Sequence, residues 1–169
     1  LRFVEALGKL KTVKHVTYAG SLRRGRETIG DLDIIVAADA NDAGAISDAF
    51  VGLEPVTEVL VKGPTKTSVR TNDNVQADLR IVGPDQFGAA LMYFTGSKEH
   101  NIAMRQRAIE RSMRLNEYGL LRDGQTVAAM TEQDVFAALG LSWIPPELRE
   151  DRGELARAEA DALPDLIEL

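Results

Sequence analysis

The sequence predicts an α+β fold: a mixed, mostly antiparallel sheet with flanking helices, followed by a small helical part that contains a β-hairpin. Three observations lead to this prediction. Apolar residues recur at helical spacing in residues 2–12 and 98–113. Residues 75–82 alternate between apolar and polar side chains, as a half-buried strand does. Asp123-Gly124 is a strong signal for a two-residue hairpin turn.

Helices and strands are interleaved in the first half of the chain. Residues 2–12 predict a short amphipathic helix, and the polar cluster 39–42 begins a second helix that Gly52 ends. A turn at Asn72-Asp73-Asn74 connects the last two strands of this half. The predicted strands are residues 13–19, 32–37, 56–61, 66–70 and 75–82.

Helices dominate the second half. Gly83-Pro84 ends the sheet region, and Pro84 suits the first turn of a helix. Trp143 is expected to be a packing anchor. The predicted elements are helices at 85–94 and 98–113, a hairpin formed by 116–121 and 125–129, a helix from Thr131 to Gly140, and an acidic helix and linker at 147–169.

The chain has 169 residues and a formal net charge of −6, and it contains no cysteine. That length can bury a substantial core. The absence of cysteine excludes disulfides and thiolate metal sites and fits a reducing compartment, so we expect a cytoplasmic protein. No apolar run approaches the roughly 20 residues of a membrane span, so no membrane association is expected. Residues 145–169 hold three basic and eight acidic residues, which leaves the rest nearly neutral.

Two carboxylates open the apolar strand 32–37 shortly after a Gly-Ser turn. Asp31 and Asp33 point to the same face because side chains alternate along a strand. Two close carboxylates repel unless a positive charge lies between them, and a divalent cation that prefers oxygen ligands supplies it. The turn at Gly20-Ser21 can offer backbone N–H groups to a phosphate. This stretch predicts metal and phosphate chemistry.

Asp78 lies on the polar side of strand 75–82, with Gln76 and Arg80. Its carboxylate is either solvated, as lone acids on strands usually are, or a third ligand of the metal. Residues 98–114 carry five basic and two acidic residues, and this face is either solvated or in contact with phosphates. His15 and His100, the only histidines, have no metal-ligand partner in the sequence and are interpreted as surface or packing residues.

Several motifs together resemble a known family. Gly20-Ser21, nine residues, then Asp31-Leu32-Asp33 resembles the signature of the nucleotidyltransferase superfamily. Arg23-Arg24-Gly25 before Glu27 and Gly30-Asp31, together with Asp78-Leu79-Arg80, resembles the DNA polymerases of family X. So does Tyr93-Phe94-Thr95-Gly96-Ser97 followed by Asn101, Arg105 and Asn116-Glu117-Tyr118. Lys98-Glu99-His100-Asn101 and Trp143-Ile144-Pro145-Pro146-Glu147-Leu148-Arg149 are closest to its bacterial and archaeal branch.

This resemblance implies a nucleotidyltransferase-type palm at residues 1–84, a thumb (fingers in another convention) at 85–146, and an acidic helical tail or linker at 147–169. In that branch a helix-hairpin-helix domain precedes the palm and a phosphoesterase domain follows the thumb, and neither is expected in these 169 residues. The resemblance also implies template-directed addition of dNTPs to a primer 3′-OH, with two Mg²⁺ ions, or Mn²⁺, as cofactors.

The roles of individual residues follow from the same resemblance. Asp31, Asp33 and Asp78 are expected to be catalytic and to bind the metals. Nucleotide binding is expected of Gly20, Ser21, Arg24, Gly30, Tyr93, Phe94, Gly96, Ser97 and Asn101. DNA binding is expected of Thr65, Lys66, Arg80, Arg105 and Glu117. The expected partners are gapped or primer-template DNA and dNTPs, and the chain is expected to be a monomer.

Two positions depart from the vertebrate repair members of this family. Gln76 stands where they carry an arginine near the primer terminus, and Lys98 replaces an acid. These departures affect contact with the primer end and the charge of the nucleotide pocket. Short-gap filling in DNA repair is the expected role. Non-templated nucleotidyl transfer, or a non-catalytic DNA-binding fragment of a larger polymerase, are the alternatives.

Overall fold

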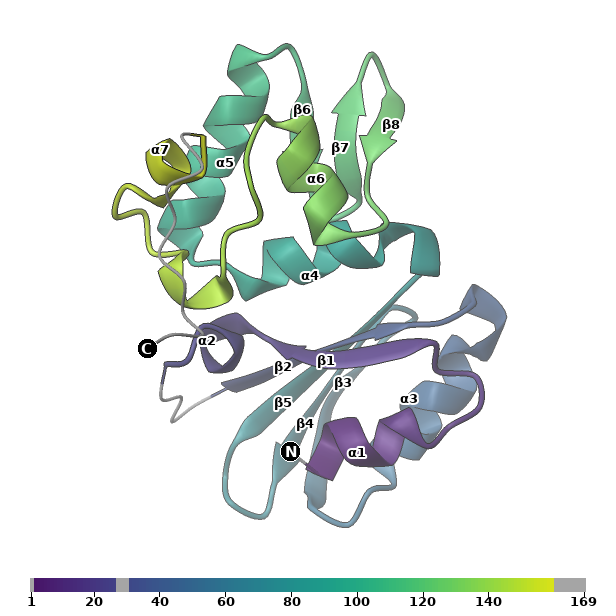
Figure 1. The fold of residues 1–169 in the computed structure, drawn as a ribbon. Helices are drawn as coiled ribbons and strands as arrows, with labels where there is room; N and C mark the ends of the chain where they lie inside the picture. Colours follow the sequence, from purple (N-terminus) through teal and green to yellow (C-terminus); the bar gives the residue numbers. More distant parts are fainter. Residues whose placement is uncertain (1, 27–30, 160–169) are drawn as a thin grey trace. The chain divides into compact units, whose positions relative to one another are not determined.

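The computed structural model describes residues 2–26 and 31–159 and divides into two compact units, Leu1–Phe87 and Gly88–Leu169 (Figure 1). The first unit contains a five-stranded sheet in the order β1-β2-β5-β4-β3. Only the β2–β5 pair is parallel, so the sheet is mixed and mostly antiparallel. The α+β fold class predicted from the sequence is confirmed. The strands are β1 (His15–Ala19), β2 (Asp31–Ala37), β3 (Val56–Lys62), β4 (Lys66–Thr71) and β5 (Gln76–Val82).

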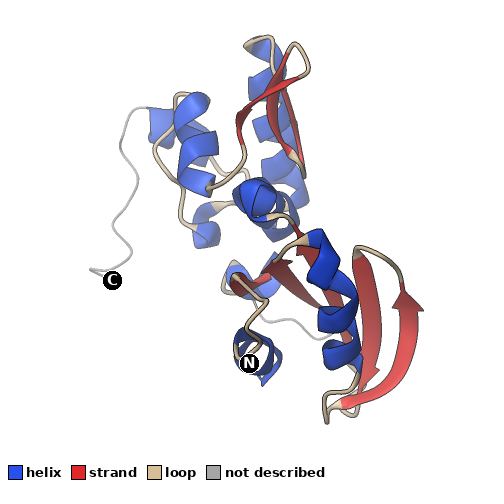
Figure 2. Ribbon diagram, turned by 90° about the vertical axis from the view of Figure 1, so that its right-hand side faces the viewer, coloured by secondary structure: helices blue, strands red, loops and turns tan. Residues whose placement is uncertain are grey.

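One face of this twisted sheet (Figure 2) carries the core of the unit. Helices α1 (Arg2–Gly8) and α3 (Ala43–Val51) lie on that face, and their Phe3 and Phe50 rings pack 5.3 Å apart. The inward-facing strand residues are fully buried against these helices, as the alternation of residues 75–82 predicted. They include Ile34, Val36, Val69, Ala77 and Leu79.

The second unit packs helices against a small antiparallel sheet, β6 (Arg114–Asn116), β7 (Gly119–Arg122) and β8 (Gln125–Ala128). Asp123 and Gly124 connect β7 to β8 with positive φ angles of 52° and 78°, as the turn signal predicted. The sequence did not reveal β6, which is only three residues long. The helices are α4 (Phe87–Thr95), α5 (Lys98–Glu110), α6 (Glu132–Ala138) and α7 (Glu154–Glu159).

The segment after Trp143 folds back into the second unit as far as Glu159. Ala158 is 2% exposed in the same core as Met104 and Phe136. The buried Arg149 pairs with Glu132, and Glu154 pairs with His100. Residues 147–159, expected as the start of a tail, are therefore packed against the helices of this unit. Among the described residues, no helix combines the length and apolarity needed to cross a membrane.

The start of α4 touches the backbone of the segment before α6. Gly88 N–H donates to the Met130 carbonyl at 3.0 Å, and Ala89 N–H donates to the Ala129 carbonyl at 2.9 Å. These bonds satisfy amides at the start of α4 that lack partners within the helix. A Cβ at position 88 would lie only 2.2 Å from the Thr131 carbonyl carbon. Only glycine fits there.

Gly88→Ala is expected to lower the free energy of unfolding by about 2–3 kcal/mol, because the backbone of Thr131 must move to admit the methyl group. Urea unfolding followed by circular dichroism measures this loss. Gly44→Ala in α3 is the matched control, since a Cβ at position 44 would have nothing within 4 Å. We expect it to be neutral or stabilising by up to about 1 kcal/mol. Equal effects of the two substitutions would contradict the close approach.

Candidate functional site

The parallel pairing of β2 with β5 brings two of the predicted acids side by side. Asp33 lies opposite Asp78 in the register, and Asp31 lies opposite Gln76. Because the side-chain period of a strand is two, Asp31, Asp33 and Asp78 share the face opposite the apolar core. Asp78 is 8% exposed, so it is not an ordinary solvated acid on the outside of a sheet.

The predicted phosphate turn follows β1 directly beside Asp33. Ala19, the last residue of β1, pairs with Asp33, and the chain then turns at Gly20 with a φ of +66°. A Cβ on Gly20 would lie 2.5 Å from Asp33 Oδ2. Glycine is therefore required both by the backbone conformation and by the close approach of the carboxylate.

A short helix, α2 (Gly20–Arg23), carries the other residues of this turn. The Arg24 amide donates to the Gly20 carbonyl at 3.2 Å, and the Arg26 amide donates to the Ser21 carbonyl at 2.8 Å. The turn thereby holds Ser21 and Arg24 immediately after the glycine that touches Asp33. Gly30, also predicted to bind nucleotide, lies outside the described residues.

Nearby polar side chains already engage both central acids. Arg80 Nη1 lies 3.5 Å from Asp33 Oδ1, and Gln76 Nε2 donates to Asp78 Oδ1 at 3.0 Å. Burial raises the pKa of the Asp33 carboxyl above its ordinary value; Arg80 opposes this shift, and the charges of Asp78 and Asp31 add to it. The negative charge on Asp33 is therefore unfavourable in the folded chain, mainly because the carboxylate is buried.

The donor set suits a hard divalent cation, since three carboxylates share one face beside a glycine turn. In residues 2–26 and 31–159, no three acidic or histidine side chains converge into a ready-made metal cage. The physical reason lies in the contacts just described. Asp33 contacts Arg80 and Asp78 contacts Gln76, while the acids repel one another.

The residues predicted to bind DNA on this sheet lie next to the acids or at the sheet margin. Lys66 pairs with Arg80 in the register of β4 and β5, and its charge weakly opposes the rise that burial causes in the pKa of Asp33. Thr65 is exposed before β4, and its carbonyl accepts from the Ile81 amide at 3.1 Å. Arg80, assigned to DNA from the sequence, is paired with Asp33 here.

The second unit gathers the other predicted nucleotide ligands where α4 meets α5. The Asn101 side chain donates through Nδ2 to the Tyr93 carbonyl at 2.7 Å, and the Asn101 backbone N–H donates to the Ser97 carbonyl at 2.9 Å. The Tyr93 and Phe94 rings meet edge to face with centroids 5.0 Å apart. Gly96, with a φ of +67°, allows the turn between the helices. Residues 93–101 thus form one cluster within this unit.

Arg105 and Glu117 lie on different elements. Arg105 is exposed on α5, one turn after Asn101, whereas Glu117 is half-buried in the turn between β6 and β7. No hydrogen bond or ion pair between them is found in the described part of the chain. Arg107, another basic residue of α5, faces protein: its guanidinium donates to the Leu139 carbonyl and to Glu159, both at 2.7 Å. Arg107 therefore does not belong to the exposed basic face of α5, which contains fewer residues than the sequence indicated.

Sequence reasoning missed the residues that hold Ser97. The Ser97 amide donates to the carbonyl of Arg149, whose buried guanidinium pairs with Glu132. His100 follows Ser97 in α5, and its Nδ1 lies 2.8 Å from Glu154 Oε2; burial lowers the pKa of the His100 ring. Arg149 and Glu132 are 17 residues apart along the chain, and His100 and Glu154 are 54 residues apart. No local sequence pattern indicates either pair.

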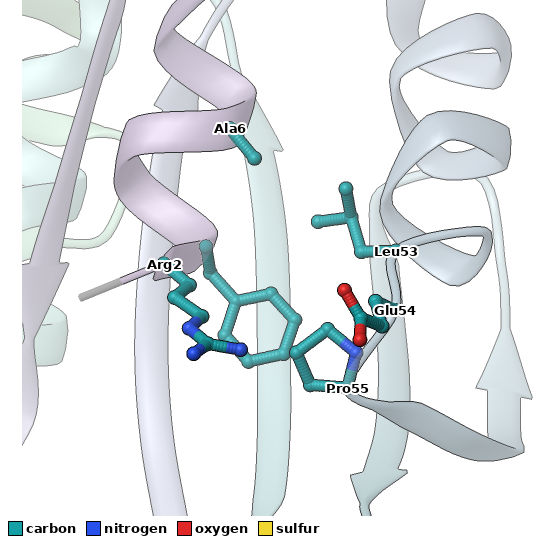
Figure 3. Close-up of a pocket in the computed structure, with 6 residues that line it drawn as sticks. Arg2, Ala6, Leu53, Glu54 and Pro55 are labelled. Atoms are coloured by element: carbon teal, nitrogen blue, oxygen red, sulfur yellow. The ribbon is translucent and has the colours of Figure 1, made fainter.

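A pocket of about 170 Å³ lies on the core side of the first unit (Figure 3). It is lined mainly by apolar groups from the start of α1 and the segment after α3. None of the residues predicted to bind metal, nucleotide or DNA lines it. The lining residues are Arg2, Phe3, Ala6, Leu53, Glu54 and Pro55.

Comparison with known proteins links both units to one group of enzymes. Residues 90–150 match the family model of the DNA polymerase beta thumb. The chain is 38% identical over 169 residues to the DNA polymerase/3′-5′ exonuclease PolX of Bacillus subtilis, covering 98% of this chain and 29% of that protein. It is 29% identical over 159 residues to DNA polymerase lambda of Rattus norvegicus, covering 78% of this chain and 28% of the relative. The chain thus spans less than a third of these relatives.

Asp33→Asn is expected to stabilise the metal-free protein at pH 7. The folded pKa of Asp33 is raised, so its contribution to stability is complete below the unfolded value of about 3.9 and is lost as the pH rises through the folded value. Replacing the charge with an amide removes that loss. Thermal melts in EDTA should show a rise of about 1 kcal/mol, or roughly 2–4 °C, at pH 7.

The difference between Asp33→Asn and the unsubstituted chain should shrink as the pH falls below the unfolded Asp pKa of about 3.9, because the Asp33 carboxyl then loses its charge as well. Asp73→Asn, in the exposed turn between β4 and β5, makes the same change without burial and should leave the melting temperature unaltered. A lower melting temperature for Asp33→Asn at pH 7 would show that the Arg80 pair outweighs the burial of the charge.

Proposed function

Because this chain belongs to DNA polymerase family X, we propose that it adds deoxynucleotides from dNTPs to a primer 3′-OH under the direction of a template. The observation that carries this proposal is the register of the parallel β2–β5 pair, which sets Asp33 beside Asp78 on the face that also carries Asp31. The contact between Gly20 and Asp33 supports it, because phosphate and metal ligands then adjoin.

Phosphoryl transfer requires alignment and neutralisation of charge more than covalent chemistry from the protein. Asp31, Asp33 and Asp78 are the residues that would hold two divalent cations, Mg²⁺ or Mn²⁺. When bound, these cations supply Lewis-acid activation of the primer hydroxyl and charge stabilisation of the departing pyrophosphate. Gln76 orients Asp78 through its 3.0 Å hydrogen bond, and Arg80 supplies a counter-charge to Asp33.

The remaining residues of the proposed mechanism bind the nucleotide and the DNA. Ser21, Arg24 and the backbone of Gly20 bind the triphosphate oxygens, since backbone amides in a glycine turn and a guanidinium are suitable phosphate ligands and this turn begins beside Asp33. In the second unit, Tyr93, Phe94 and Gly96 contact the sugar, Asn101 the base edge and Ser97 a phosphate. Lys66, Thr65 and Arg105 contact DNA, and Glu117 accompanies Arg105 at the template. The substrate we assign is a short gap in duplex DNA.

Incorporation of dNTPs on a gapped duplex with Mg²⁺ or Mn²⁺ tests this function. We expect the added nucleotide to match the template base. Asp33→Ala and Asp78→Ala should each lower the rate by about 10³-fold or more, because each removes a carboxylate that would hold the cations facing the reacting phosphate. Asp73→Ala removes an exposed carboxylate and is the matched control.

Full incorporation by Asp33→Ala and Asp78→Ala would reject the catalytic assignment. Incorporation that ignores the template base would instead favour non-templated nucleotidyl transfer. Tight DNA binding without turnover by the unsubstituted chain, at saturating dNTP, would indicate a fragment that only binds DNA.

Gly20→Ala is expected to lower kcat/KM by about 10²-fold, because the new methyl group displaces the Asp33 carboxylate that it overlaps. Gly124→Ala separates this effect from backbone strain: Gly124 also has a positive φ, +78°, but a Cβ at this position would have nothing within 4 Å. Both variants should lose about 1 kcal/mol of stability. Only Gly20→Ala should lose activity in a primer-extension assay, and equal activities would contradict the contact.

A further inference from the structure

We propose that Arg149, held by Glu132 and Trp143, is a positioning residue for the turn Thr95–Ser97 and thereby sets the affinity for the incoming dNTP. The inference rests on the proposed function, because it takes Ser97 and its neighbours to bind that nucleotide. Arg149 itself touches no substrate in this proposal. It acts through the backbone of Ser97, from 52 residues further along the chain.

Arg149 has no exposure to solvent, and Glu132 is 4% exposed. The two side chains form a two-pronged ion pair, with Nη1 to Oε2 at 2.8 Å and Nη2 to Oε1 at 3.1 Å. Arg149 Nε donates to the Ile144 carbonyl at 2.9 Å. The guanidinium carbon also lies 5.1 Å from the ring centre of Phe136 and 5.6 Å from that of Trp143. The side chain is therefore fixed from several sides.

The backbone of Arg149 reaches the nucleotide-binding turn. Its carbonyl accepts the Ser97 amide at 3.0 Å. Ser97 Oγ accepts the His100 amide at 3.2 Å and so caps α5. The Ser97 carbonyl accepts the Asn101 amide at 2.9 Å. Ser97 is 5% exposed, and a shift of the Arg149 carbonyl would displace the start of α5 together with Asn101.

A second buried pair fixes the segment that follows Arg149. His100 Nδ1 lies 2.8 Å from Glu154 Oε2, and the Asp151 and Arg152 amides also donate to that carboxylate, at 3.0 and 2.7 Å. Residues 149–154 are therefore attached to the first turn of α5 at both ends. This arrangement restrains the turn more closely than a single hydrogen bond would.

The choice of an ion pair favours a positioning role. Burying two charges costs several kcal/mol per ion, so apolar residues of similar size commonly stabilise a core equally well. What the pair adds here is a fixed orientation, because a guanidinium and a carboxylate meet in one plane through two bonds. Lysine keeps the charge but cannot form this fork or stack in the same way.

Arg149→Lys in the 169-residue chain tests the proposal. A displaced turn weakens nucleotide binding, so KM for the dNTP should rise about tenfold, within the 10²-fold that a small misplacement can cost. A purely structural role would lower the fraction of active enzyme and hence the apparent kcat, with KM unchanged. Arg152→Lys makes the same change at an exposed arginine three positions away and should alter neither constant.

Trp143 provides a readout that does not require turnover. It is the only tryptophan of the chain, and its Nε1 donates to Glu132 Oε1 at 3.0 Å. Adding dNTP with Ca²⁺ should change its fluorescence, and the midpoint of this titration should move to about tenfold higher dNTP in Arg149→Lys. Thermal melts recorded in parallel show whether the variant is folded at the assay temperature.

Four outcomes decide the proposal. A higher KM together with a shifted titration midpoint in folded Arg149→Lys supports it. Turnover by the unsubstituted chain with the same KM in Arg149→Lys overturns it and leaves the proposed function intact. If Arg149→Lys does not fold, Trp143→Phe, which keeps the ion pair and loses one donor to Glu132, must raise KM or the proposal fails. Absence of both turnover and dNTP binding by the unsubstituted chain overturns the proposed function and this inference together.

Discussion

The parallel pairing of β2 with β5 is the constraint on which the first unit depends. Every other pairing in this sheet is antiparallel, and a one-residue slip of this pair would move Asp33 to the apolar face. The same register places Ile34 beside Leu79 in the core under α1 and α3. Burial of apolar residues on one face of the sheet therefore fixes the acidic side chains on the other face. The strand pairing that forms the core also forms the site.

The negative charge on Asp33 remains unfavourable in the folded chain. Burial and the neighbouring carboxylates disfavour the charge on Asp33, while Arg80 and Lys66 favour it. Gly20 brings the chain so close to Asp33 that a Cβ at position 20 would overlap the Asp33 carboxylate. Unfavourable burial of charge is typical of functional sites, where some stability of the fold is lost to keep charged groups available for a ligand. A divalent cation at these carboxylates would relieve it.

In the second unit, the short turn between α4 and α5 is held in place by contacts from other segments. The turn at Thr95–Ser97 has little apolar surface of its own to fix it. Two buried side-chain pairs that involve the segment after Trp143 hold it instead, Arg149 with Glu132 and His100 with Glu154. Because a buried charge that loses its partner is costly, each pair has one preferred arrangement. This explains why residues 147–159 belong to the unit.

The sequence by itself determined the fold class, the strand with Asp31 and Asp33, the alternation that sets Asp78 opposite the core residues, and the Asp123-Gly124 hairpin. These features depend on side-chain periodicity and local backbone preference, which a short segment carries alone. Tertiary structure decided whether Asp78 is solvated or a neighbour of Asp33, because that depends on which strands pair. It also decided that Arg80 contacts Asp33 and that Arg149 supports Ser97, since such contacts join residues far apart in sequence and leave no local pattern.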